Sequence, residues 1–230
     1  MNKFYVIGTP IGNLEDISYR AVRILNEVDL VLCEDTRVTI NLLNKYSINK
    51  PTMSYHSQSK LSKVDKILEM IAEGKTLALV SDAGTPTISD PGSMLISKIR
   101  AAFSEIEIIA IPGPSALVSA LSISGLPASE FAFLGFLPHK KGRETLFKEI
   151  ASAERTVVFY ESPHRILKAL ESLKDHLALP EPSSRKIVVA RELTKVFEQI
   201  VSGTAEEILK YFADNPDKVR GEFVVMVSAK

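Results

Sequence analysis

Short apolar runs alternate with amphipathic stretches along the first half of the chain. The runs are rich in Val, Ile and Leu, which is typical of buried strands. They lie at 3–8, 29–35, 76–81 and 106–111. The stretches between them repeat an apolar residue every third or fourth position, which predicts helices. They lie at 18–28, 37–46, 60–74 and 92–103. This alternation predicts a mostly parallel sheet with helical crossovers.

The second half orders its elements differently. Strands are predicted at 131–136, 156–161, 186–192, 197–203 and 221–228. Helices are predicted at about 142–152, 163–175 and 204–213. The last three strands lie close together in the sequence, which favours a mixed or more antiparallel sheet. Pro112, Gly113 and Pro114 break the chain between the halves, and a helix is expected to start near Pro114. We therefore predict two α/β domains, 1–112 and 113–230.

Two of the predicted helices carry recognisable end signals. Ser18 stands before the first helix, where its hydroxyl can accept a hydrogen bond from the first turn. Gly74 follows the third helix, where glycine commonly ends a helix.

Composition places the chain among ordinary globular proteins. It has 230 residues, of which 45% are hydrophobic and 24% charged. The single cysteine fits a reducing compartment, and no apolar run approaches the roughly 20 residues of a membrane span. The first residues resemble a strand rather than a signal peptide, so a cytoplasmic protein is expected. The 28 basic and 28 acidic residues exclude a wholly basic nucleic-acid coat protein, but they leave a local basic patch open.

Gly- and Pro-rich loops follow the first and third predicted strands. In "VIGTPIGNLEDIS" (6–18) the glycine spacing is not the dinucleotide-binding fingerprint. In "SDAGTPTISDPG" (81–92), Asp82 and Asp90 offer acceptors and Thr85 offers a hydroxyl. Each loop is either a plain connection or a ligand site at the carboxyl ends of the strands. A metal site is not expected, because no His or Cys accompanies the two aspartates.

The motif "CEDTR" (33–37) ends the second predicted strand with two acids and an arginine. In one interpretation Asp35 or Thr36 caps the next helix and Arg37 pairs with a neighbour. In the other, these charges contact a substrate. The residues by themselves leave both open.

Charged motifs also follow strands of the second half. "GFLPHKKGRE" (135–144) is either a solvated loop or a contact for a phosphate backbone. In "FYESPHRI" (159–166), Glu161 and His164 could act as acid and base, or His164 could begin a helix. "ARELTKVFE" (190–198) is similar. No Ser-His-Asp order, nucleophile elbow or His/Cys metal spacing is present.

Seven of these motifs, in this order, resemble the small-subunit ribosomal RNA methyltransferase I family, a group of 2′-O-ribose methyltransferases within the tetrapyrrole methylase superfamily. The motifs are "GTPIGNLEDIS", "CEDTR", "SDAGTPTISDPG", "IPGPSA", "GFLP", "FYESPHR" and "ARELTK". Each is weak alone, but the ordered set is specific and extends from Tyr5 to about Val227. Longer family members have a further C-terminal segment, so any RNA contact made there is expected to be missing.

The resemblance implies a two-domain fold with S-adenosylmethionine (AdoMet) in a cleft between the domains. It also implies a homodimer that methylates a cytidine 2′-hydroxyl in the decoding region of small-subunit (16S) rRNA or of the 30S particle. Family motifs place the cofactor contacts in the loops of both domains. They are Pro10, Asp82, Gly84, Thr85, Ser115, Ala116, Ala190 and Gly221. Ser81 departs from the superfamily motif, which often has Gly there.

Methyl transfer from a sulfonium needs no metal, but it needs in-line alignment and a proton acceptor for the ribose hydroxyl. The candidate acceptors are Glu34, Asp35, Glu161 and Glu192. Glu161 is favoured, and Asp35 is the second predicted catalytic residue. The basic residues of the motifs are expected to contact RNA. They are Lys140, Lys141, Arg143, Arg37, His164, Arg165 and Arg191.

Two alternatives remain at this point. The chain could methylate a tetrapyrrole precursor, since the cofactor loops are shared across the superfamily. It could also be a non-catalytic module that binds AdoMet or RNA.

Overall fold

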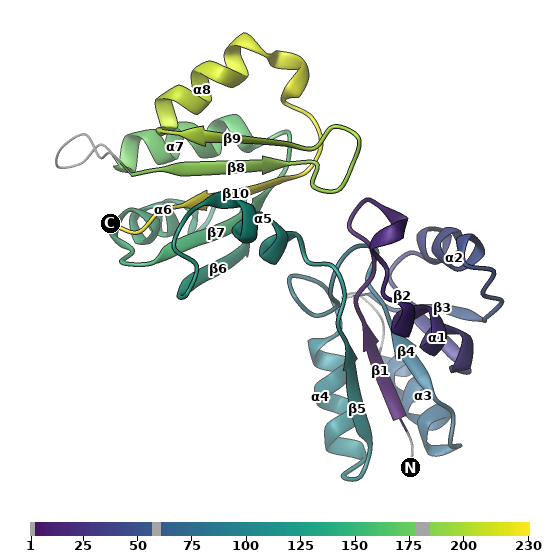
Figure 1. Cartoon of the computed structure of the whole chain (residues 1–230). Coiled ribbons are helices and arrows are strands. Elements are labelled where there is room, and N and C mark those ends of the chain that lie inside the picture. The colour runs from purple at the N-terminus through teal and green to yellow at the C-terminus, as the bar shows by residue number, and fades with distance from the viewer. Residues whose placement is uncertain (1–2, 57–60, 178–184) are drawn as a thin grey trace. The chain divides into compact units, whose positions relative to one another are not determined.

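The structure is a computed structural model that describes residues 3–56, 61–177 and 185–230. The chain divides into two compact units, Met1–Ser115 and Ala116–Lys230, drawn in Figure 1. The predicted domain boundary after residue 112 lies in the same Pro- and Gly-rich segment as this division.

The first unit is built on a five-stranded parallel sheet with the strand order β3-β2-β4-β1-β5. Its strands are β1 (Lys3–Ile7), β2 (Leu30–Cys33), β3 (Thr52–Ser54), β4 (Leu77–Leu79) and β5 (Glu107–Ile111). Its helices are η1 (Leu14–Asp16, a 3₁₀ turn), α1 (Tyr19–Glu27), α2 (Thr36–Lys45), α3 (Leu61–Ala72) and α4 (Ser93–Ala102). The predicted parallel sheet is confirmed.

Helices cover both faces of this sheet, which explains why its strands are continuously apolar. Val31 and Ala78 pack in one cluster with residues of α1 and α2. Leu32 and Leu77, their neighbours in sequence, pack in the other cluster with α3 and α4. Successive side chains of a strand point to opposite faces, so a strand buried on both sides needs an apolar residue at every position.

The second unit is built on a five-stranded mixed sheet with the order β6-β7-β10-β8-β9. Its strands are β6 (Phe131–Phe136), β7 (Thr156–Glu161), β8 (Ile187–Arg191), β9 (Gln199–Gly203) and β10 (Phe223–Val227). Its helices are α5 (Ala116–Ser124), α6 (Arg143–Ser152), α7 (Ile166–Leu177), α8 (Ala205–Asp214) and η2 (Pro216–Lys218, a 3₁₀ turn). β6 and β7 are parallel and the other pairs antiparallel, as the strand spacing predicted.

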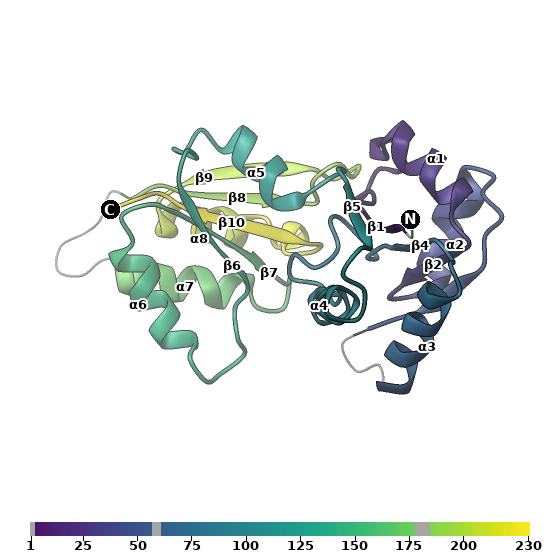
Figure 2. The same ribbon diagram turned by 90° about the horizontal axis from the view of Figure 1, so that it is seen from below.

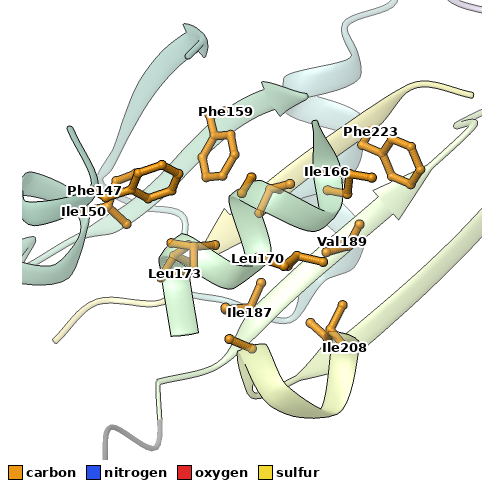
Figure 3. Close-up of a cluster of buried hydrophobic side chains, with 14 of the residues drawn as sticks. Phe147, Ile150, Phe159, Ile166, Leu170, Leu173, Ile187, Val189, Ile208 and Phe223 are labelled. Atoms are coloured by element: carbon orange, nitrogen blue, oxygen red, sulfur yellow. The ribbon is translucent and has the colours of Figure 1, made fainter. Parts of the chain in front are cut away.

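The core of the second unit lies between its sheet and the helices α6, α7 and α8. Phe147 from α6, Leu170 from α7 and Ile208 from α8 meet Phe159 and Phe223 from the strands, and all five are almost fully buried (Figure 3). Figure 2 shows α5 on the other side of this sheet, where it contacts β10. The unit therefore has three layers.

Local signals place most element ends correctly. The Ser18 side chain accepts a hydrogen bond from Ala21 N at 3.1 Å, so it caps α1 as predicted. Gly74 adopts φ +88° just after α3. The helix expected near Pro114 begins at Ala116. Strand β3 was not predicted, because its three half-buried residues lie at the sheet edge and show no apolar run. None of the helices in the described ranges is both long and apolar enough to cross a membrane.

Candidate functional site

Three loops of the first unit meet at the carboxyl ends of adjacent strands. The loops follow β1, β4 and β5. Thr9 N donates to Gly84 O at 2.8 Å and Gly84 N donates to Thr9 O at 3.1 Å, which joins the first two loops. Thr85 Oγ1 donates to Pro114 O at 3.3 Å, which joins the third. Parallel strands end at the same sheet edge, where α/β sheets bind ligands.

Two glycines allow this convergence. A Cβ placed on Gly113 would lie 2.6 Å from Gly8 O, and one on Gly8 would lie 2.8 Å from Gly113 Cα. No real Cβ tolerates such distances, so the loops after β1 and β5 can cross only at glycine. Gly84 is also required, because it adopts φ +82°.

The buried hydroxyls of Thr9 and Ser81 make further hydrogen bonds within the loops. Both residues are almost fully buried. Thr9 Oγ1 donates to Ser81 O at 3.1 Å, and Ser81 Oγ lies 3.3 Å from Gly84 O. The serine at the position where the superfamily often has Gly thus contributes a side-chain contact to the loop.

A pocket of about 180 Å³ opens beside these loops. Thr9 and Pro10 line it from the β1 loop, Ser81 and Asp82 from the β4 loop, and Thr39 from α2. It brings two predicted cofactor residues, Pro10 and Asp82, to one concave surface. Of the other predicted residues of these loops, Gly84 pairs with Thr9 through its backbone and Thr85 contacts Pro114 O through its hydroxyl.

Carboxylates gather next to the pocket, after β2 and β4. Asp35 N donates to Asp82 Oδ1 at 3.0 Å and so ties the two strand ends together. Burial raises the pKa of the Glu34 carboxyl to about 7, and the nearby charges of Asp90 and Asp82 add to the shift. Burial also raises the pKa of Asp90 to about 6, against a hydrogen bond with Ser81. Glu34 is therefore partly protonated near neutral pH.

Asp35 has a different environment. Its side chain accepts a hydrogen bond from Arg37 N at 2.9 Å and caps α2. Hydrogen bonds from the Arg37 side chain lower the pKa of Asp35 to about 2. The capping interpretation of "CEDTR" is confirmed, and the charge of Arg37 is directed at its own cap.

In the second unit, Glu161 is enclosed by two arginines. Its side chain is 0% exposed, while those of Arg143 and Arg165 are 14% and 17% exposed. Arg143 Nη2 lies 3.2 Å from Oε2, and Arg165 Nε lies 2.8 Å from Oε1. Ser162 N also donates to Oε1 at 2.8 Å. Both oxygens are engaged, so the carboxylate is arranged to hold the guanidinium groups.

The predicted RNA-contacting residues of this unit lie largely at one edge of its sheet. Lys140, Lys141 and His164 are exposed close to Arg143 and Arg165 in sequence. The strand register also brings a more distant residue to this edge. Phe223 of β10 pairs with Glu161 of β7 on one side and with Arg191 of β8 on the other. Arg191 therefore lies at the same end of the sheet as Glu161. Arg37 belongs to the first unit.

The remaining predicted contacts of the second unit have structural partners. Lys195 Nζ lies 2.9 Å from Glu192 Oε1 and 2.9 Å from Glu222 Oε2. A Cβ on Gly221 would lie 2.4 Å from Glu192, so glycine is needed there. Ala190 is fully buried within the sheet. Glu192 is therefore held by Lys195.

The last two predicted cofactor residues, Ser115 and Ala116, are half-buried and lie at the start of α5. In the part of the chain that the structure describes, no group of three His, Cys, Asp or Glu side chains could hold a metal ion.

Comparisons with known proteins agree with this fold and these motifs. The family description "Tetrapyrrole (Corrin/Porphyrin) Methylases" matches residues 3–209. The chain belongs to the tetrapyrrole methylase family. It is 44% identical over 230 residues to the ribosomal RNA small subunit methyltransferase I of Thermotoga maritima, and the match covers 100% of both chains. It is 43% identical to the protein of the same name from Vibrio cholerae, over 97% of this chain and 76% of that protein.

Solved structures with the same fold superpose on this chain. A diphthine synthase superposes with a TM-score of 0.75 at 16% identity, over 100% of this chain and 90% of that chain. A cobalt precorrin-4 methyltransferase superposes with a TM-score of 0.69 at 18% identity, over 98% and 94%. At such identities the likeness concerns the fold alone, and it confirms the predicted fold class.

Sequence reasoning missed two features of this tetrapyrrole methylase. The first is the effect of the Asp90 charge on the pKa of Glu34. The two acids are far apart in the sequence and come close only because β2 and β4 are neighbouring strands. The pairing of Gly8 with Gly113 was also missed. A glycine within two residues of the end of each of two predicted strands was the available signal.

Replacing Gly113 by Ala tests the crossing of the loops. The new Cβ must displace Gly8, and such overpacking costs about 1–3 kcal/mol. We expect faster amide exchange at Thr9 and Gly84, whose mutual hydrogen bonds depend on the crossing, measured by hydrogen exchange. Pro112→Ala, at an exposed neighbour, is the control. Unchanged protection at Thr9 and Gly84 would contradict the structural role.

Proposed function

We propose that this chain transfers the methyl group of AdoMet to the 2′-oxygen of a cytidine in small-subunit rRNA. The observation that carries the proposal is the full-length similarity to the Thermotoga maritima rRNA methyltransferase. The ordered motifs support the same ribose chemistry. We extend the proposal, as the resemblance implies, to a homodimer that acts in the cytoplasm on 16S rRNA or the 30S particle.

Two residues of the pocket in the first unit suit contacts with a polar cofactor. Gly8 and Gly113 let the loops after β1 and β5 approach each other beside the pocket. Asp82 uses Oδ1 to accept from Asp35 N, which leaves Oδ2 for an amino or hydroxyl group of the cofactor. Pro10 supplies a rigid apolar contact in the same pocket. AdoMet supplies an activated methyl group when bound, so the protein must mainly orient the ribose and accept its proton.

Among the predicted carboxylates, Glu34 has the pKa best suited to accept a proton near neutral pH. A general base works best when its pKa lies near the operating pH, and that of Glu34 is raised to about 7. Asp35, with its pKa lowered to about 2, is too weak a base. Glu161 and Glu192 are committed to neighbouring cations. The proposed roles of Asp35 and Glu161 are therefore to position neighbouring groups.

The reaction then proceeds in one displacement. The Glu34 carboxylate takes the proton of the 2′-hydroxyl, and the ribose oxygen forms a bond to the methyl carbon. Bound AdoMet would supply the methyl group and keep the electron pair of the broken carbon–sulfur bond on its sulfur, while Pro10 and Asp82 would hold the cofactor. The chain contributes a base, an aligned cofactor loop and cations for the RNA.

The substrate assignment is tested by methyl transfer. We expect tritiated methyl groups from AdoMet to appear on small-subunit particles that lack the modification, and mass spectrometry to map them to a cytidine ribose. A porphyrinoid substrate is offered in a parallel reaction. Transfer to the porphyrinoid alone would favour the tetrapyrrole alternative, and AdoMet binding without transfer to either would favour a non-catalytic module.

Replacing Glu34 by Gln tests the proton acceptor. We expect kcat to fall by about 10²- to 10⁴-fold with an unchanged AdoMet Kd measured by calorimetry. In the wild type, kcat should rise with pH through about 7, because the carboxylate must be ionised to act. Asp90→Asn is the matched variant: it removes a neighbouring negative charge, so the rise should move to lower pH.

The Glu34→Gln substitution also has an expected effect on the free energy of unfolding. The pKa of Glu34 is raised in the folded chain, so ionisation lowers the free energy of unfolding as pH rises from the unfolded pKa towards 7. Glu34→Gln should therefore be at least as stable as the wild type at pH 8. Full turnover by this variant would exclude Glu34 as the base.

Replacing Lys140 and Lys141 together by Gln tests the basic edge of the second unit. Each lost phosphate contact should reduce the slope of log K against log salt by roughly 0.7 to 0.9. The measurement is RNA affinity across a salt series. Lys148→Gln with Lys174→Gln is the control, since it removes the same charge further along α6 and α7. Equal slopes for the two double variants would contradict a local role of Lys140 and Lys141.

A further inference from the structure

Phe136 is an exposed aromatic side chain at the end of β6. Phe136 is 58% exposed, although most large apolar residues of the unit are buried. The ring packs edge-on against Tyr160, with centroids 5.4 Å apart and an interplanar angle of 62°. Tyr160 packs in turn against Phe133 at 5.0 Å. Phe136 is thus supported from one side and open on another.

The two residues after Phe136 anchor a pair of arginines. Arg165 Nη1 donates to Leu137 O at 2.8 Å. Arg143 Nη1 donates to Pro138 O at 3.3 Å. These bonds place two guanidinium groups beside the chain segment that presents the aromatic ring.

Glu161 holds both arginines in place through ion pairs. It is buried, and its two oxygens each contact one guanidinium, at 3.2 and 2.8 Å. Arg143 is also held over the Phe147 ring at 5.1 Å. Two cations share one anion, so the cluster keeps a net positive charge while its side chains stay oriented. Such preorganised guanidinium groups suit a phosphate, which accepts several hydrogen bonds at once.

The residues around the cluster are mostly basic. His139, Lys140, Lys141 and His164 are exposed nearby in sequence. Glu144, in the first turn of α6, is the acidic neighbour, and its carboxylate lies 2.7 Å from the Nε2 atom of His176. The surface therefore combines an exposed aromatic ring with a positive rim.

We propose that Phe136, Arg143 and Arg165 form a binding site for one unstacked nucleotide of an RNA strand. The base stacks on the open side of Phe136, and the phosphate bridges the two guanidinium groups. Proteins that bind single-stranded RNA commonly combine aromatic stacking with cationic phosphate contacts. The inference rests on the proposed function and adds the place where the substrate strand is held.

A second exposed aromatic residue provides a contrast. Phe197 is 69% exposed, but the lysine near it is paired with two carboxylates, whereas beside Phe136 two arginines share one carboxylate. Arg191 donates to Phe197 O and to Arg220 O, and Lys195 pairs with two glutamates. Lys195 therefore contributes no excess positive charge beside Phe197, which makes this residue a suitable contrast to Phe136.

The test compares Phe136→Ala, Phe136→Leu and Phe136→Tyr, with Phe197→Ala as the control. The probe is a fluorescein-labelled single-stranded oligoribonucleotide, and its Kd is measured by anisotropy. Phe136→Ala should weaken binding about 5- to 100-fold, the effect of losing one base stack. Phe136→Tyr should restore affinity, because it keeps the ring, and Phe136→Leu should not. Phe197→Ala should bind like the wild type.

Kinetics on small-subunit particles extend the test. Phe136→Ala should raise KM for the particle and leave the Kd for AdoMet unchanged. Glu161→Gln should also raise this KM more than it lowers kcat, because it releases the arginines without touching the reacting atoms.

Three results would overturn the inference. They are equal RNA affinity of Phe136→Ala and the wild type, an equal loss in Phe197→Ala, and a change of molecular mass in Phe136→Ala without loss of RNA affinity. The last result would mean that a second copy of the chain covers Phe136. A wild type that binds the oligoribonucleotide through Phe136 but methylates no rRNA would instead refute the proposed function alone.

Discussion

The close approach of Gly8 and Gly113 is the constraint on which the candidate site depends. With any side chain at either position, the loops after β1 and β5 could not cross. The crossing brings Pro114 within reach of Thr85, and the loop of Thr9 pairs with that of Gly84. Short parallel strands end at one edge, but only side-chain-free positions let their loops meet there. The pocket beside Pro10 follows from this arrangement.

The two units use charge in opposite ways. In the first, carboxylates crowd at the ends of β2 and β4, and burial with mutual repulsion raises the pKa of Glu34 into the range useful for proton transfer. In the second, one buried carboxylate, Glu161, orders two arginines and leaves an excess of positive charge. The net charge of zero for the whole chain conceals both arrangements. Each arrangement lies at the end of a strand, where a rigid sheet holds polar groups in fixed positions.

Much of the fold was predictable because it depends on local patterns. The apolar runs of β1, β2 and β4 and the helix-capping role of Ser18 involve neighbours in sequence. Strand β3 was not predictable, because its pairing with β2 depends on the sheet and not on an apolar pattern of its own. The motifs likewise pointed to the loops after β1, β4 and β5, which the structure joins by hydrogen bonds, while the pairing of the carboxylates depended on partners far along the chain.

Glu161 illustrates where sequence alone stops. Its motif marked it as a polar residue at a strand end, and a base was a reasonable hypothesis. Arg143 reaches it from a different element, and that contact commits the carboxylate to an ion pair. The sequence by itself determined the alternation of strands and helices, the glycine-rich loops and the family, since these depend on local periodicity and ordered motifs. Only the tertiary structure decided which acids are paired, which are buried and in which direction their pKa values shift, because burial and charge proximity depend on strand order and packing.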